Sequence, residues 1–310
     1  MTHDTGGKGL PHIPVLLSET INFLDVKPGG FYIDATLGAG GHTKAILQKE
    51  PSAKVLGIDC DPIAIETAKK NLSGKEGLNF TAVPGNFADI ESISANSGKA
   101  DGVVADLGIS SMQIADARRG FSFNSDGNLD MRMGGEASGG ISASDVVNTF
   151  PEEELERIFR LYGEERFAGR IARAIVKNRT RQTFTTARSL GDLVARCVGF
   201  RRGRRIHPAT RVFQALRIFV NNETENLARF LDALPRVLKK GGRCVVISFH
   251  SGEDRIVKKA FASYALSGTG RLLTRKPVVP CREEIERNPR SRSAKLRAIE
   301  FVCGGDSAGG

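Results

Sequence analysis

The chain has 310 residues, of which 40% are apolar and 26% charged, and it carries a formal net charge of +10 at neutral pH. This length allows one large or two medium domains with a sizeable core, and the composition is that of a globular protein. No apolar run reaches the 18 residues of a membrane-spanning helix, so we expect no membrane association. The first 16 residues lack the apolar stretch of a secretion signal, which predicts a short tail on a cytoplasmic protein.

The cysteines give no sign of a disulfide framework. Their number is odd and none stand at CxxC spacing, so we also expect no zinc site and a reducing compartment. Small buried or half-buried apolar side chains are their expected role. The five positions are Cys60, Cys197, Cys244, Cys281 and Cys303.

The charge is unevenly distributed along the chain. Residues 1–150 hold 12 Lys and Arg against 18 Asp and Glu, whereas residues 151–217 hold 16 against 7 and residues 271–297 hold 9 against 3. Both basic segments are rich in arginine, whose guanidinium can bind a phosphate through two hydrogen bonds. The pattern predicts a small-ligand site in the acidic half and polyanion contacts in the basic segments, unless the basic helices are only solvated faces.

The first third of the chain alternates between apolar runs and helical patterns. Pro62 stands at a favourable first helical position after the second run. Alternation at this spacing predicts a parallel α/β sheet. We predict strands over 29–37, 53–61, 78–87 and 100–108, with helices over 42–50 and 62–72.

The alternation stops after the fourth strand and returns near residue 211. A loop-like stretch leads into helical patterns over 142–179 and 186–198, with helix starts expected at Ser144 and Pro151. Residues 211–250 then predict a long helix, a Lys-Lys-Gly-Gly turn and a buried strand, and a last strand follows near 295–303. We therefore predict an α/β domain in two parts, 1–124 and 213–310, with a basic, substrate-facing helical insertion over 125–212.

Polar features stand at the ends of all four predicted strands, where ligands bind in open parallel sheets. The Gly38–His42 turn permits close backbone approach and leads into a helix whose free N–H groups favour an anion. Asp59 can accept both hydroxyls of a ribose, Phe87 offers a flat face to a purine, and Asp106 can face a cation. Each residue alone could be a strand-end cap or a core side chain. Their recurrence at four successive strand ends favours one ligand site.

The same residues restrict which nucleotide fits. The turn lacks the lysine of a GxxxxGK[ST] loop, which excludes a phosphate-loop NTPase, and it is a poor match to GxGxxG. Acidic groups near the ligand disfavour a polyphosphate. They suit a cationic, ribose-containing molecule with its own carboxylate, and S-adenosylmethionine is such a molecule. The contact made by Asp34 stays open at this point.

The sequence resembles the MraW/RsmH-type methyltransferases, which act on small-subunit ribosomal RNA, over nearly its whole length. The resemblance is carried by "IDATLGAGGHT" (33–43), "GIDCDPIAI" (57–65), "DLGISSMQIADARRGFSFNSDGNLDMRM" (106–133), "HPATRVFQALRIFVNNE" (207–223) and "ISFHSGEDRIVK" (247–258). It implies a class I S-adenosylmethionine-dependent methyltransferase, Rossmann-like with a mostly parallel sheet and an inserted all-helical domain.

The resemblance also implies an activity, a cofactor site and a partner. The activity is N4-methylation of a cytidine in the decoding region of 16S ribosomal RNA, within an assembled or nearly assembled small subunit. The implied S-adenosylmethionine contacts are Gly40, Gly41, His42, Asp59, Phe87, Asp106 and Gln113. All of these except Gln113 also follow from the strand-end pattern.

Asp106 is the candidate catalytic residue. The N4 lone pair of cytosine is delocalised into the ring, so a hydrogen-bond acceptor that directs it toward the methyl group would assist transfer. DNA amino-methyltransferases place an Asp/Asn/Ser-Pro-Pro-aromatic motif after their fourth strand. Residues 106–111, "DLGISS", keep the acid here but lack the prolines and the aromatic residue. We predict that Asp106 lies at the transfer site and that Ser110 and Ser111 help to orient the base. A role of Asp106 in holding only the methionine amino group stays open.

Further substrate contacts are expected in the segment that follows. Arg118 and Arg119 could hold phosphates, and Phe121 or Phe123 could stack on a base. Asp130 with Arg132 could recognise the cytosine edge, or the two could form an internal pair.

Two histidines and one loop complete the candidates. His250 follows a strand and is expected to face the substrate, whereas His207 precedes Pro208 and has the position of a helix cap. The arginine-rich loop 199–205 is a further candidate for RNA contact. No cysteine or carboxylate stands at ligand spacing near either histidine, so we expect no catalytic metal.

Two other functions remain compatible with the sequence. A methyltransferase could act on another substrate, such as DNA cytosine or a protein. A non-catalytic RNA-binding or ribosome-assembly factor could also keep this fold, although acids and glycines at all four strand ends argue against it.

Overall fold

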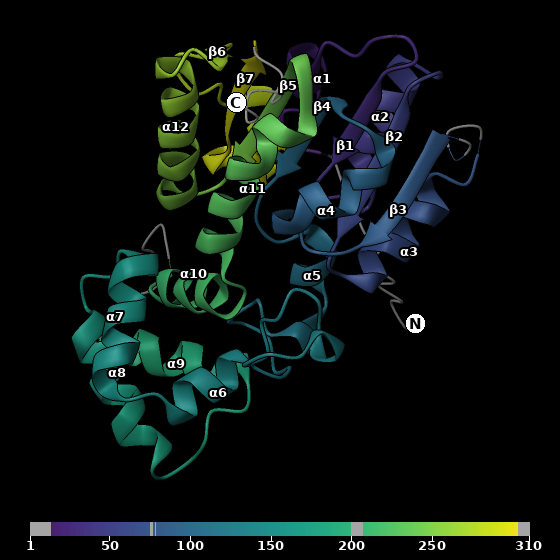
Figure 1. Ribbon diagram of the computed structural model, residues 1–310. Helices are drawn as coiled ribbons and strands as arrows, with labels where there is room; N and C mark the ends of the chain where they lie inside the picture. The colour runs from purple at the N-terminus through teal and green to yellow at the C-terminus, as the bar shows by residue number, and fades with distance from the viewer. Residues whose placement is uncertain (1–13, 75–76, 78, 200–206, 303–310) are drawn as a thin grey trace.

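The computed structural model describes residues 14–74, 77, 79–199 and 207–302. The first 13 residues of the predicted tail, Cys303 and nearly all of the arginine-rich loop lie outside these ranges. Figure 1 shows two parts, a twisted sheet flanked by helices and a group of helices, α6 to α10, to one side of it. Among the described residues, none of the helices combines the length and apolarity needed to cross a bilayer.

A seven-stranded sheet in the order β3-β2-β1-β4-β5-β7-β6 forms the centre of the first part. The first five strands in that order are parallel, and β7 is antiparallel to both of its neighbours. The mostly parallel α/β sheet predicted from the sequence is therefore confirmed. The strands are β1 (Phe31–Asp34), β2 (Lys54–Asp59), β3 (Phe80–Pro84), β4 (Ala100–Asp106), β5 (Leu238–Ser248), β6 (Gly270–Leu272) and β7 (Lys295–Phe301).

Helices cover both faces of this sheet. Successive residues of β4, Val103 and Val104, are fully buried in two different hydrophobic clusters, one on each face. Burial on both faces explains the continuous apolar run of this strand. The helices beside the sheet are α1 (Leu17–Leu24), α2 (Gly41–Lys49), α3 (Pro62–Asn71), α4 (Ile90–Ser94), α5 (Ser111–Ala115), α11 (Glu223–Val237), α12 (Ser251–Leu266) and α13 (Arg282–Arg287).

The second part has a hydrophobic core of its own, formed by residues between Phe121 and Leu216. Its helices are α6 (Ala143–Thr149), α7 (Glu152–Gly163), α8 (Ala168–Arg179), α9 (Ala187–Cys197) and α10 (Ala209–Val220). Helix α10 continues across residue 212 and packs mainly against the helices of the second part. We keep the division into 1–124, 125–212 and 213–310 as a proposal, with α10 as the shared element between the parts. Short 3-10 turns complete the structure at Phe87–Asp89, Ala95–Ser97, Ala117–Arg119, Glu136–Ser138 and Pro289–Ser293.

The structure corrects four local predictions. The long helix predicted after residue 211 is two helices, α10 and α11, separated at Asn221 and Asn222. Helix α6 begins after Ser142, whose side chain accepts from the Asp145 N–H in a capping box, and not at Ser144. The predicted Lys-Lys-Gly-Gly turn lies inside β5: Leu238 pairs with Ala100 and Arg243 with Gly102, so the residues between them bulge out of the pairing. Among the cysteines described, Cys60 and Cys281 are exposed and only Cys244 is fully buried.

Candidate functional site

A cavity of about 300 Å³ opens at the carboxyl ends of the parallel strands. It lies where the strand order reverses between β1 and β4, which is the usual ligand position in such a sheet. Its volume is at the lower end of the range for small-ligand pockets. Of the predicted cofactor and transfer-site residues, the wall includes Gly41, His42, Asp59, Phe87, Asp106, Ser110, Ser111 and Gln113.

The glycine turn between β1 and α2 forms one side of the cavity. Gly38 and Gly40 have positive φ angles of 52° and 83°, which favour glycine, and Gly40 is the N-cap of α2. At Gly41 a Cβ atom would lie 2.3 Å from Pro14 Cγ, so the close packing of the N-terminal segment also requires glycine. Gly40 sets the backbone conformation but is not itself part of the wall.

The role left open for Asp34 is that of a brace. This fully buried carboxylate accepts from Thr43 Oγ1 at 2.7 Å and from the Thr36 N–H at 3.4 Å, and it does not line the cavity. Burial raises its pKa, and the hydrogen bonds oppose that shift only in part. Asp34 therefore ties the start of α2 to the end of β1.

Asp59 and Phe87 stand at the ends of the next two strands. The carboxylate of Asp59 accepts from the N–H groups of Gly38 and Asp61, both at 2.8 Å, and burial raises its pKa to about 6. The ring of Phe87 lies edge-on to Phe230 with centroids 5.5 Å apart, and it also forms part of the cavity wall. An acid that can accept ribose hydroxyls and a flat aromatic face thus line the same cavity.

Asp106 and His42 face each other at the end of β4. His42 Nε2 lies 3.5 Å from Asp106 Oδ2, and the Asp106 N–H donates to Thr36 Oγ1 at 2.6 Å. Burial lowers the pKa of His42, but Asp106 and Asp34 more than offset this, so the net shift is upward. In the described part of the chain, Asp106 Oδ1 and both ring nitrogens of His42 are buried without a hydrogen-bond partner. The unpaired ring nitrogens of His42 fit the carboxylate at the methionine end of a sulfonium cofactor, and Asp106 Oδ1 is left to accept from a second ligand group.

Gln113, which the strand-end pattern missed, holds the loop after β4 in place. It forms a capping box with Ser110 at the start of α5, and its Nε2 donates to Asp61 Oδ2 at 3.1 Å and to the Met133 carbonyl at 3.2 Å. The Ser-x-x-Gln spacing at 110–113 is the signal that could have shown this.

Five of the predicted substrate contacts lie outside the cavity wall: Arg118, Arg119, Asp130, Arg132 and His250. Arg119 pairs with Asp61 at 3.1 Å and donates to two main-chain carbonyls, and Arg132 binds both oxygens of Asp130. These pairs organise the 118–133 segment internally, so they give no support to Arg119, Asp130 or Arg132 as substrate contacts. Arg118 is exposed and paired with Asp116.

The aromatic candidates of this segment also pack within the protein. Phe121 is buried in the helical core, which does not leave its ring free for a base. Phe123 stacks on His207 with ring centroids 4.4 Å apart. His207 Nδ1 accepts from the Ala209 N–H at 3.2 Å, which agrees with the capping role expected for it.

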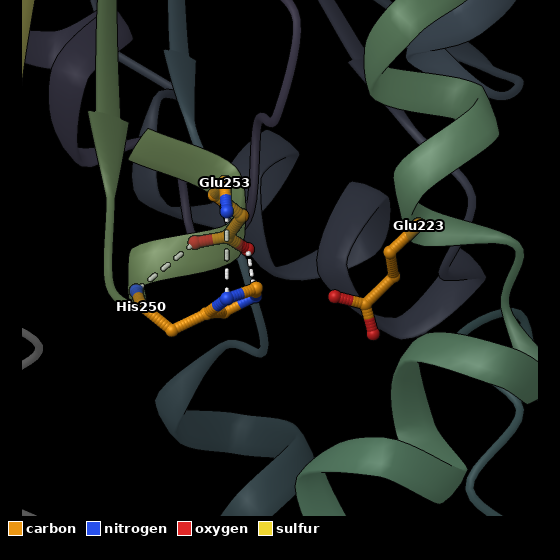
Figure 2. A group of neighbouring side chains, drawn as sticks. All are labelled: Glu223, His250 and Glu253. Atoms are coloured by element: carbon orange, nitrogen blue, oxygen red, sulfur yellow. Dashed lines mark hydrogen bonds and ion pairs between the residues drawn. The ribbon is translucent and has the colours of Figure 1, made fainter. Parts of the chain in front are cut away.

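His250 was expected to face the substrate, but it is not part of the cavity wall. It is the N-cap of α12, with Nδ1 accepting from the Glu253 N–H at 3.4 Å and Nε2 lying 3.1 Å from Glu253 Oε1, as Figure 2 shows. A histidine after a strand looks the same in sequence whether it caps a helix or meets a ligand. The neighbouring residues Phe249 and Glu253 line the cavity instead.

Glu223, His250 and Glu253 form a cluster whose ligand atoms lie within 4.8 Å of one another (Figure 2). Arg217 already occupies this cluster: its Nε and Nη2 bind the two oxygens of Glu223 at 2.7 and 2.8 Å, and Nη2 lies 4.0 Å from Glu253. The buried guanidinium neutralises the carboxylates that a metal ion would need. We therefore assign the cluster to an ion-pair network.

Comparison with known proteins identifies the family. The model of the MraW methylase family matches residues 9–302.

The chain belongs to the MraW methylase family.

Two relatives illustrate how closely this methylase resembles other members. It is 47% identical to "Ribosomal RNA small subunit methyltransferase H" of Carboxydothermus hydrogenoformans over 93% of this chain and 97% of the relative. The protein of the same name from Bradyrhizobium diazoefficiens is 49% identical over 94% and 91%. The family resemblance and fold class predicted from the sequence are confirmed. A solved rRNA methylase from Streptococcus thermophilus aligns over 94% of this chain and 99% of that one, with 10% identity and a TM-score of 0.45.

The pKa of Asp59 makes a testable prediction about cofactor binding. A ribose hydroxyl donates to an ionised carboxylate better than to a neutral one, so S-adenosylmethionine affinity should rise as pH increases through about 6. Isothermal titration across that range should show the rise in the native protein. Asp59→Asn should bind more weakly, by about 10-fold, and without the inflection. An inflection that persists in Asp59→Asn would assign it to another group.

Proposed function

We propose that this protein transfers a methyl group from S-adenosylmethionine to the N4 atom of a cytidine in the decoding region of small-subunit ribosomal RNA. The main observation in support is one continuous cavity that joins the predicted cofactor residues to the unpaired acceptor of Asp106. The names of the two relatives support ribosomal RNA of the small subunit as the substrate.

Each chemical group of S-adenosylmethionine has a suitable partner among the residues of the cavity wall. Asp59 accepts the ribose hydroxyls, and the ring of Phe87 packs on the adenine. The start of α2, with His42, takes the carboxylate of the methionine end. When bound, S-adenosylmethionine supplies a methyl group on a positively charged sulfur atom, already activated toward a nucleophile.

The residues of the chain then have to orient a weak nucleophile. Asp106 Oδ1 accepts a hydrogen bond from the N4 amine, which turns the nitrogen lone pair toward the methyl group. With the cofactor bound, the Asp106 carboxylate would stabilise the positive charge that develops on the amine during methylation, and it would accept the proton that N4 gives up. The loop through Ser110 and Ser111 lines the cavity next to Asp106, and the Gln113 contacts fix its conformation.

The basic C-terminal segment supplies a contact for the RNA at this cavity. The turn Pro289–Ser293 brings Arg290 to the cavity wall together with Asn288, far in sequence from the wall residues at the ends of β1 to β4. Arg290 is exposed and has no acidic partner among the residues that the structure describes. A free guanidinium at the rim of the site suits a phosphate of the RNA strand that carries the target base.

Replacing Asp106 by asparagine separates the two roles of this residue. If Asp106 orients and polarises the amine, Asp106→Asn should lower kcat about 10²- to 10³-fold while the Kd for S-adenosylmethionine changes little. Single-turnover methylation and calorimetry measure the two quantities. A large loss of cofactor affinity with unchanged single-turnover rate would instead assign Asp106 to the methionine amino group.

Replacing Arg290 by alanine tests the phosphate contact. Arg290→Ala should weaken RNA binding and reduce the slope of log K against log salt by about one, without changing S-adenosylmethionine affinity. The matched control is Arg282→Ala, because Arg282 lies in the same segment but pairs with Glu286 and is not part of the cavity wall. An equal effect of both changes would mean that only the net charge matters.

A methyl-transfer assay separates the proposed substrate from the alternatives. Labelled cofactor is offered with naked small-subunit RNA, DNA, ribosomal protein and small subunits isolated from cells that lack this gene. We expect label only in small-subunit RNA, free or assembled. Label in DNA or protein would replace the proposed substrate, and failure to bind S-adenosylmethionine would favour a non-catalytic assembly factor.

A further inference from the structure

The loop after β4 contains an acid but lacks an aromatic residue to hold a flat base. The neighbouring strand β5 brings one to the same place. Asp106 pairs with Ile247 in the sheet, and the Leu107 N–H donates to the Ile247 carbonyl at 2.9 Å. Two residues beyond Ile247, Phe249 therefore lies beside the start of the loop.

Gly108 lies next to this ring. Its φ of +96° favours glycine, and a Cβ atom at that position would lie 3.8 Å from Phe249 Cδ2. Both residues line the cavity together with Asp106. Phe249 is half-buried: it packs against the hydrophobic cluster on one face of the sheet while part of it remains in the cavity wall.

A buried charge network fixes the backbone that carries this ring. Glu253 Oε2 accepts from the Phe249 N–H at 2.8 Å and from the His250 N–H at 3.4 Å. Burial alone would raise the pKa of Glu253. The charges of His250 and Arg217 and the hydrogen bonds from His250 and the Phe249 N–H more than offset this, so the pKa of Glu253 lies below its usual value. Figure 2 shows Glu253 against His250, with Glu223 facing them from the opposite side. The network places the backbone of Phe249 with charge-assisted hydrogen bonds, which are stronger than neutral ones.

We propose that Phe249 is the aromatic face on which the target base stacks during methyl transfer, and that Glu253 is the positioning residue that holds it there. This inference rests on the proposed function, because it assumes that a base enters the cavity. A base taken out of its RNA stack loses stacking energy, and an aromatic side chain restores part of it without hydrogen bonds to the base. The ring thus takes the place of the aromatic residue that the loop after β4 lacks.

The test uses Phe249→Leu, which keeps apolar volume for the core but removes the flat face, and Phe249→Tyr, which keeps the face. Small subunits that lack the methylation serve as substrate, with S-adenosylmethionine affinity and melting temperature measured in parallel. Stacking on an aromatic ring is worth about 1–3 kcal/mol per base, so kcat/KM for the subunits should fall about 5- to 150-fold in Phe249→Leu. Phe249→Tyr should stay within about threefold of the native enzyme.

Phe87→Leu provides the matched control, since Phe87 is an aromatic residue of the same cavity assigned to the cofactor. It should raise the KM for S-adenosylmethionine and leave the KM for subunits nearly unchanged, the reverse of Phe249→Leu. If folded Phe249→Leu kept the native kcat/KM for the subunits, the inference about Phe249 would be overturned and the proposed function would not. Loss of S-adenosylmethionine affinity in Phe249→Leu would also overturn the inference. An inactive native enzyme that binds S-adenosylmethionine normally would overturn the proposed function, and the inference with it.

Discussion

The parallel register of the central strands is the constraint on which the site depends. Asp34 pairs with Gly57 and Val104, Asp59 with Pro84, and Asp106 with Ile247. Because parallel strands end at the same edge, acids that are 25 or more residues apart in the chain lie at one edge of the sheet, and Asp59 and Asp106 line the cavity there. Strand β5 belongs to the same parallel set, and it adds Phe249 from the far end of the chain to that edge.

The acids at this edge have different hydrogen-bonding partners and therefore different roles. Asp34 is braced by Thr43 and Thr36, and Asp59 is held by two N–H groups, so hydrogen bonds offset part of the cost of burying each carboxylate. One oxygen of Asp106 has no such partner in the structure as described. A buried acceptor left unpaired destabilises the folded protein unless a ligand completes it, which is why we place the chemistry at Asp106.

The sequence predicted those parts of the site that depend on local pattern. Strand ends can be found from apolar runs, which singled out Asp59, Phe87 and Asp106 as candidates. The cavity wall includes all three, and their contacts with a cofactor stay a prediction. Residues whose position depends on distant segments could not be predicted in this way. Nothing near Arg119 indicates that Asp61 will neutralise it, and the position of Phe249 follows only from the pairing of β4 with β5. His250 was misassigned because a helix cap and a ligand contact have the same local signature.

The most direct test of the central claim is the mass mapping of small-subunit RNA from cells with and without this gene. We predict that one methyl group, on the N4 atom of a cytidine in the decoding region, is missing when the gene is absent and returns when the gene is restored. Asp106→Asn should fail to restore it. An unchanged methylation pattern, or loss of a methyl group from a different base, would contradict the account.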